Sequence, residues 1–78
     1  MADINFEIIK ELGVISEMKR GITKGWSKEL NIVSWEDADP KFDIRIWAPN
    51  HEKAGKGVTL TRNEAEELYE LLGRALAK

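Results

Sequence analysis

Few side chains in this sequence are suited to catalysis. The chain has one histidine, His51, one tyrosine and no cysteine, so carboxylates are the main remaining acid–base groups. Glu36, Asp37 and Asp39 lie together in a stretch with the composition of a solvated turn. The segment Lys53–Gly57 resembles a phosphate-binding loop only superficially, because a strand pattern rather than a helix follows it. These features predict a protein that is not an enzyme and that uses no metal or other cofactor.

Tryptophans interleaved with cations form the pattern best suited to binding. Trp26 lies two residues from Lys24 and from Lys28, and Trp47 lies two residues from Arg45. Residues two apart on a strand share a face, so each of these rings would stand beside a positive charge. Such a surface suits single-stranded nucleic acid, because bases stack on the rings while cations, Arg45 among them, contact phosphates.

Core packing is the alternative role for each tryptophan, and for most tryptophans on strands it is the ordinary one. Trp47 differs because its strand already has a complete apolar face. That face consists of Phe42, Ile44 and Ile46. We therefore expect Trp47 to be exposed on the opposite face beside Arg45, where its loss would affect folding only modestly.

The sequence leaves the faces of Trp26 and Trp35 open. Trp26 shares its alternate set with Leu30 and Ile32, so the pattern is equally consistent with burial and with exposure. A bulge near Asn31 would move Trp35 to either face of the sheet. Both tryptophans stay candidates for binding on the strength of their residue type.

The distribution of charge is more informative than its total. The net charge is −2, whereas nucleic-acid-binding domains are usually basic, so ordinary mixed surface charge is the alternative. Residues 19–28 nevertheless hold four cations and no acid, and residues 45–57 hold three cations against one acid. A basic groove beside acidic rims is therefore compatible with the negative total.

Hydrophobic periodicity predicts four strands and one helix. The strands are expected at about residues 6–18, 26–35, 42–47 and 57–60, and the helix at about 62–76. Gly13 indicates a bulge in the first strand, and Thr61 with Glu64 three residues later forms a capping box before the helix. The expected fold is α+β, a single domain over residues 1–78 in which a strongly twisted, four-stranded antiparallel β-meander precedes a C-terminal α-helix.

A partner subunit is the expected source of extra stability. A chain of 78 residues buries only about 60% of its unfolded surface, and small domains commonly add a disulfide, a metal or a second subunit. Without cysteine, and with a single histidine, only the subunit remains. Tyr69 and Leu71 also widen the apolar stripe of the helix beyond what one small sheet covers, so we expect a homodimer joined through this helix.

The sequence shows no feature of a membrane or secreted protein. No apolar run approaches the roughly 20 residues of a membrane span, and the first five residues lack the basic and apolar regions of a secretory signal. We therefore expect a cytoplasmic protein with no membrane partner, with association with the nucleoid as an alternative.

The run Phe42-Asp43-Ile44-Arg45-Ile46-Trp47, then a loop, the run Gly55–Leu60 and a capped helix resemble the positive cofactor four family of transcriptional coactivators. The segment Gly25–Trp35 is similar to the bacterial, YdbC-type branch of that family. The resemblance covers nearly the whole chain, roughly Phe6 to Leu76. It implies a homodimer whose sheets form grooves for single-stranded DNA with little sequence preference.

The resemblance also implies which residues line the groove. It matches Arg45, Trp47 and Lys56 to groove positions, places Lys28 on a strand lysine and sets Trp35 near a stacking aromatic, where the spacing departs from the eukaryotic pattern. The complete set of nucleic-acid-binding candidates is Lys24, Trp26, Lys28, Trp35, Arg45, Trp47, Lys53 and Lys56.

Two hypotheses about function follow. In the first, the chain acts in transcription regulation or in handling single strands, with RNA as an alternative ligand and the transcription machinery as a further partner. In the second, it is a protein-interaction module in which the three tryptophans anchor a peptide or a subunit. Quenching of tryptophan fluorescence by an oligonucleotide separates the two.

Overall fold

A computed structural model describes residues 5–77 of the chain. The elements in order are β1 (Phe6–Glu17), β2 (Ser27–Trp35), β3 (Lys41–Trp47), a short 3-10 turn η1 (Pro49–His51), β4 (Ala54–Leu60) and α1 (Arg62–Leu76). The strands pair antiparallel in the order β1-β2-β3-β4, so the expected α+β meander with a C-terminal helix is confirmed. The fourth strand begins before the position expected from the sequence. The single domain expected over residues 1–78 includes residues 1–4 and 78, which lie outside the described part.

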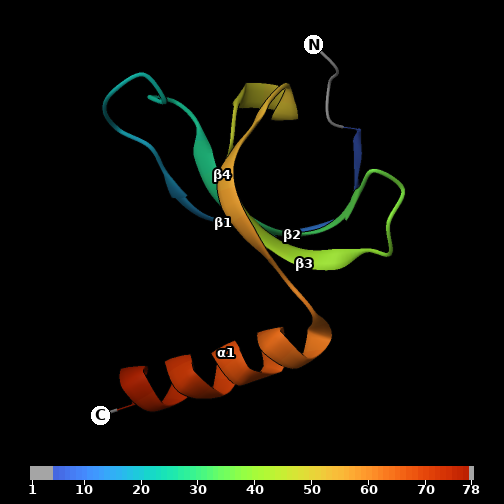
Figure 1. The fold of residues 1–78 in the computed structure, drawn as a ribbon. Coiled ribbons are helices and arrows are strands. Elements are labelled where there is room, and N and C mark those ends of the chain that lie inside the picture. Colours follow the sequence, from blue (N-terminus) through green and yellow to red (C-terminus); the bar gives the residue numbers. More distant parts are fainter. Residues whose placement is uncertain (1–4, 78) are drawn as a thin grey trace.

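The sheet is strongly curved because β1 carries three bulges. The pairing of β1 with β2 shifts register at Ile9, Leu12 and Ile15, whereas the described pairing of β2 with β3 is regular. Each bulge adds a residue to one strand and increases the local twist. The sheet therefore bends into the arch seen in Figure 1. The bulge that Gly13 indicated is the middle one of the three.

The arch has a concave face that is buried and a convex face that is largely open. The most deeply buried side chains share the concave side of β2 and β3: Glu29, Asn31, Val33, Asp43 and Trp47. Phe42, Ile44 and Ile46, which the sequence suggested as the buried face, are only half-buried on the convex side. Curvature explains the difference. Side chains on the concave face pack against one another, whereas those on the convex face stay partly exposed unless another surface packs on them.

The helix begins as the sequence predicts. The Thr61 hydroxyl accepts a hydrogen bond from the backbone N–H of Glu64 at 3.1 Å, and the Glu64 carboxylate accepts one from the Thr61 N–H at 2.9 Å. From this capping box α1 runs along the convex side of the arch (Figure 1). None of its described residues is buried. Its wide apolar stripe is therefore largely exposed in the single chain.

Candidate nucleic-acid interface

One buried carboxylate, that of Asp43, orients two of the candidate residues. Its Oδ1 accepts a hydrogen bond from Nε of Arg45 at 2.8 Å, and its Oδ2 accepts one from Nη2 of Arg45, also at 2.8 Å. The indole Nε1 of Trp35 donates to the same Oδ2 at 3.1 Å. Because Asp43 is fully buried and holds the guanidinium through two charge-assisted bonds, the position of Arg45 is fixed and its charge is largely neutralised.

The β4 strand completes this clamp. Nη1 of Arg45 donates to the carbonyl of Gly55 at 2.9 Å. Gly57 is paired with Arg45, and a Cβ at position 57 would lie 1.9 Å from the Cβ of Arg45. The close approach of β4 therefore requires glycine at this position. Three of the five guanidinium N–H donors are thus used within the protein.

Arg45 also caps a stack of aromatic rings. Its Cζ lies 4.5 Å from the ring centroid of Trp35, a cation–π distance. Trp35 and Trp47 are nearly parallel at 8°, with centroids 6.1 Å apart. Phe6 packs on both tryptophans, at 5.5 and 5.1 Å, and His51 meets Trp47 edge-on at 5.1 Å. These separations lie in the favourable range for aromatic pairs, so the stack is a rigid unit with Trp47 in its interior.

The expectation that Trp47 is exposed is wrong. The strand alternation correctly places Trp47 on the face opposite Phe42 and Ile44, beside Arg45. Its side chain is nevertheless fully buried, because the curvature of the arch brings Phe6 and His51 over it. Its indole N–H has no hydrogen-bond partner among the described residues. Trp47 therefore packs inside the stack, against the ring of Trp35.

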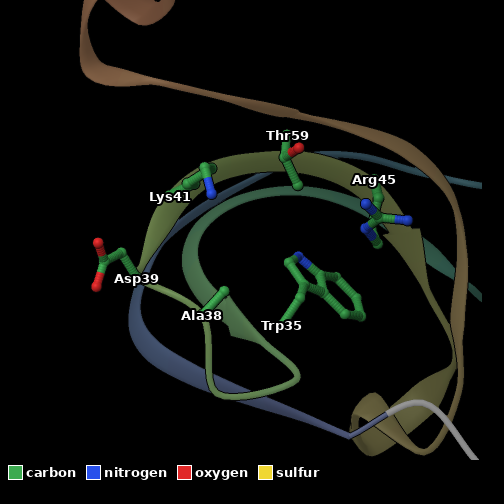
Figure 2. A pocket seen from close by; sticks show the side chains of 6 residues that line it. All are labelled: Trp35, Ala38, Asp39, Lys41, Arg45 and Thr59. Atoms are coloured by element: carbon green, nitrogen blue, oxygen red, sulfur yellow. The ribbon is translucent and has the colours of Figure 1, made fainter.

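The open side of the stack borders a hollow of about 220 Å³. It is lined by Trp35, Ala38, Asp39, Lys41, Arg45 and Thr59. In Figure 2, Trp35 and Arg45 face each other inside the arch, with Lys41 and Thr59 along the strands above them. Trp35 is only half-buried, so part of its ring is accessible from this hollow. The site thus combines an accessible indole, an oriented guanidinium and a lysine.

Lys41 is a site residue that the sequence analysis missed. It pairs with Val33 and lies two residues before Asp43 on β3, which puts it on the concave face. The available signal was its spacing of two from Asp43 and four from Arg45. The strand expected from the sequence began at Phe42 and so excluded Lys41, whereas the observed strand begins at Lys41.

A second buried carboxylate, that of Glu29, joins η1 to β2. It accepts hydrogen bonds from Ser27 and from Nδ2 of Asn31 at 3.0 Å, and its Oε1 lies 2.8 Å from Nε2 of His51. Asn31 in turn accepts a bond from the backbone N–H of Leu12 at 3.3 Å, which ties β1 to the same network. Burial alone would raise the pKa of Glu29, but these hydrogen bonds and the electrostatic attraction of His51 outweigh it and lower the pKa below its ordinary value.

Three candidates, which we call the outer cluster, lie away from the concave face. Lys28 pairs with Ile46 of the convex face. A Cβ at Gly55 would come within 3.0 Å of both the Ile46 and Trp26 side chains, so Trp26 packs on this same side. Lys24 belongs to the turn just before β2. The faces that the sequence left open are thereby resolved: Trp35 is concave and Trp26 is convex.

The last two candidates are Lys53, in the connection between β3 and β4, and Lys56, the third residue of β4. Both side chains are exposed. The carbonyl of Lys53 accepts a hydrogen bond from the backbone N–H of Ala48 at 3.0 Å, and Lys56 lies where the pairing of β3 with β4 shifts register. The structure thus groups Trp35, Arg45 and Trp47 on the concave face, whereas the outer cluster lies away from it and Lys53 and Lys56 lie at or just before the start of β4.

A family model described as Transcriptional Coactivator p15 (PC4) matches residues 22–71. This span includes β2, β3 and β4, and so the whole Asp43 clamp. The chain belongs to the PC4 family. The resemblance to positive cofactor four is thereby confirmed at the level of the family, which binds nucleic acid and is not a family of enzymes.

A relative of this PC4-family chain occurs in Treponema pallidum (strain Nichols). It is described only as an uncharacterized protein, and it is 43% identical over 70 residues, which cover 90% of this chain and 78% of the relative. Within residues 5–77, no helix is both long enough and apolar enough to cross a membrane.

We expect the lowered pKa of Glu29 to make the fold sensitive to acid. A carboxylate whose pKa is lowered by folding adds stability above its ordinary value of 4.5, and this stability is lost as pH falls through the folded-state pKa. Glu29→Gln should reduce the free energy of unfolding by about 1–3 kcal/mol at neutral pH, the range for a broken buried hydrogen-bond network. Urea titrations above and below pH 4.5 measure both effects, and the exposed Glu11→Gln serves as the control. An unchanged acid limb in Glu29→Gln would contradict this account.

Proposed function

We propose that this PC4-family chain binds single-stranded DNA through its concave face, with little sequence preference. The observation that carries the proposal is the clamped pair of Trp35 and Arg45, which presents an accessible ring and a fixed guanidinium beside Lys41. Bases stack on aromatic rings and guanidinium planes, and every base has a face that can stack. Membership of the PC4 family also supports single-stranded DNA as the ligand.

We further propose that the functional unit is a homodimer joined through α1 and the convex face. Tyr69, Leu71, Leu72 and Leu76 of α1 are each about half or more exposed in the single chain. Together with the convex face of the sheet, α1 borders an apolar hollow of about 350 Å³. Contiguous exposed apolar surface marks interaction sites, and a second copy of this chain supplies a matching surface.

The cellular role that we propose is transcription regulation or the handling of exposed single strands, in the cytoplasm or at the nucleoid. The family description as a transcriptional coactivator supports contact with the transcription machinery, and the treponemal relative supports assignment to the bacterial branch. RNA is the competing ligand in this proposal. The outer cluster, Lys53 and Lys56 are proposed as further contacts where the strand continues beyond the concave face.

Tryptophan fluorescence during titration with oligo-dT of about 20 nucleotides tests the proposal directly. Quenching that saturates supports binding by stacking. Flat emission at low salt would contradict the proposal and favour the alternative, a module that uses its tryptophans to anchor a peptide or subunit. Competition by oligo-U measures the preference between DNA and RNA.

The salt dependence of binding should come from lysines rather than from Arg45. The sequence suggested Arg45 as a phosphate contact, but the structure neutralises its charge with Asp43. Each phosphate neutralised on a single strand contributes about −0.7 to the slope of log affinity against log salt. We therefore expect Lys41→Ala to flatten that slope and Arg45→Ala to weaken binding with the slope nearly unchanged. Anisotropy titrations at several salt concentrations measure both, and a slope flattened by Arg45→Ala would show that Arg45 contacts phosphate.

A further inference from the structure

The hollow beside Trp35 is bordered by the turn that connects β2 to β3. Ala38 and Asp39 of this turn belong to its lining. The turn is closed by a hydrogen bond from the N–H of Ala38 to the carbonyl of Trp35 at 2.9 Å, and by one from the Ser34 hydroxyl to the carbonyl of Ala38 at 2.6 Å. The hollow therefore has a defined wall where β2 ends.

The surface of this turn is negatively charged. Glu36, Asp37 and Asp39 lie within four consecutive residues, and all three are exposed. No lysine or arginine occurs between positions 29 and 40. In Figure 2 the carboxylate of Asp39 points away from Trp35, toward the outside of the arch. A nucleic-acid backbone that continued from the hollow over this turn would bring phosphates against carboxylates, which is unfavourable. A strand that enters the hollow is therefore favoured to end there.

The lining of the hollow also contains a cation whose charge is uncompensated. Lys41 is exposed and makes no ion pair with any residue in the range 5–77, whereas the guanidinium of Arg45 is paired with Asp43 at 2.8 Å. A lysine ammonium acts on phosphate as a point charge, so its attraction grows with the charge of the phosphate. A phosphate monoester carries a charge of about −1.5 to −2 at neutral pH, more than an internal phosphodiester. Lys41 therefore favours a terminal phosphate over an internal one.

We propose that the hollow binds the terminal nucleotide of a single strand, with its phosphate monoester at Lys41 and its base on the accessible part of Trp35. The acidic turn excludes a continuing backbone, while the ammonium attracts the additional charge of the end. Specific binding commonly combines a repulsive and an attractive element in this way. This inference rests on the proposed single-strand function and adds a class of substrate to it: strands that end in a phosphate, at the 5′ or the 3′ end.

The test measures, by tryptophan quenching, the affinity for a short oligo-dT that has hydroxyl groups at both ends, a 5′-phosphate or a 3′-phosphate. An oligo-dT that is one nucleotide longer and ends in hydroxyl groups is the control, because it has the same number of phosphates as the phosphorylated forms. At low salt we expect a phosphorylated form to bind roughly fivefold more tightly than both hydroxyl-ended forms, the size of an exposed charge pair. The comparison of the 5′- and 3′-phosphates identifies the end that lies in the hollow.

Substitution of Lys41 assigns this preference to the hollow. Lys41→Ala and Lys41→Gln should bind the phosphorylated and the longer oligonucleotides with equal affinity, whereas Lys41→Arg, which keeps the charge, should keep the preference. Lys28→Ala is the matched control, because it removes the same charge from the convex side and should leave the ratio of the two affinities unchanged. Circular dichroism checks that each variant is folded.

Three results would contradict different parts of the account. If the wild-type chain binds the phosphorylated and the longer oligonucleotides equally, the terminal-phosphate site is wrong and the proposed function stands. A preference that survives in a folded Lys41→Ala chain would place the terminal phosphate elsewhere and overturn the role of the hollow. Failure of the wild-type chain to bind any of these oligonucleotides would instead contradict the proposed function itself.

Discussion

Trp47→Ala is expected to lower the free energy of unfolding by about 3–5 kcal/mol, the range for truncating a buried tryptophan. For a chain of 78 residues, this is a large share of the total stability. The ring is fully buried, and it contacts Phe6, Trp35 and His51 in one stack. Its removal leaves a cavity under the Trp35 platform. We therefore expect an unfolded chain or a loosened concave face, in place of the modest effect that the sequence suggested.

Urea denaturation followed by circular dichroism measures this effect. Trp26→Ala is the matched control, because Trp26 is only half-buried on the convex side, and it should cost less. Trp47→Phe keeps an aromatic ring in the stack and should recover part of the stability. A midpoint for Trp47→Ala close to that of the wild-type chain would contradict the aromatic stack as the centre of the fold.

Leu72→Glu is expected to abolish the proposed homodimer. Leu72 is 48% exposed in the single chain and lines the apolar hollow between α1 and the sheet. A carboxylate has little effect at a half-exposed position of a monomer, but it is strongly unfavourable in an apolar interface. The variant should therefore sediment as a monomer, bind oligo-dT weakly and unfold at lower urea concentration.

Sedimentation equilibrium measures the first of these effects. Asn63→Glu is the matched control, because it places the same charge in the exposed first turn of α1, where an acid is favourable. A wild-type chain that sediments as a monomer at micromolar concentration would contradict the proposed dimer. A dimer that persists in Leu72→Glu would show that another surface joins the two copies.

The fold was predictable because its signals are local. Period-two alternation identified β3 and placed Trp47 opposite Phe42, and the capping box of Thr61 and Glu64 marked the start of α1. These patterns depend on neighbours within a few residues. The faces of Trp26 and Trp35 depended on the register between β2 and β3. This register is set by contacts between strands, and no local sequence pattern indicates it.

The site was less predictable because it depends on curvature and on contacts between strands. Gly13 indicated one bulge in β1, whereas the three bulges together close the arch over Trp47. The role of Asp43 was not foreseen, because its hydrogen bond to Trp35 crosses from β3 to β2. Two hydrogen bonds from Arg45 to the same carboxylate fix the plane of its guanidinium.

The central claim is that the concave face, with Trp35 as its accessible ring, holds the single strand. The most direct test is the affinity for fluorescein-labelled oligo-dT, measured by anisotropy for Trp35→Ala and for Trp26→Ala, with folding of both variants checked by circular dichroism. Loss of one stacking ring costs about 1–3 kcal/mol per base, or roughly ten- to hundredfold in affinity. We expect a loss of this size for Trp35→Ala and a smaller one for Trp26→Ala. A folded Trp35→Ala chain that binds as tightly as the wild type, or a larger loss in Trp26→Ala, would contradict the claim.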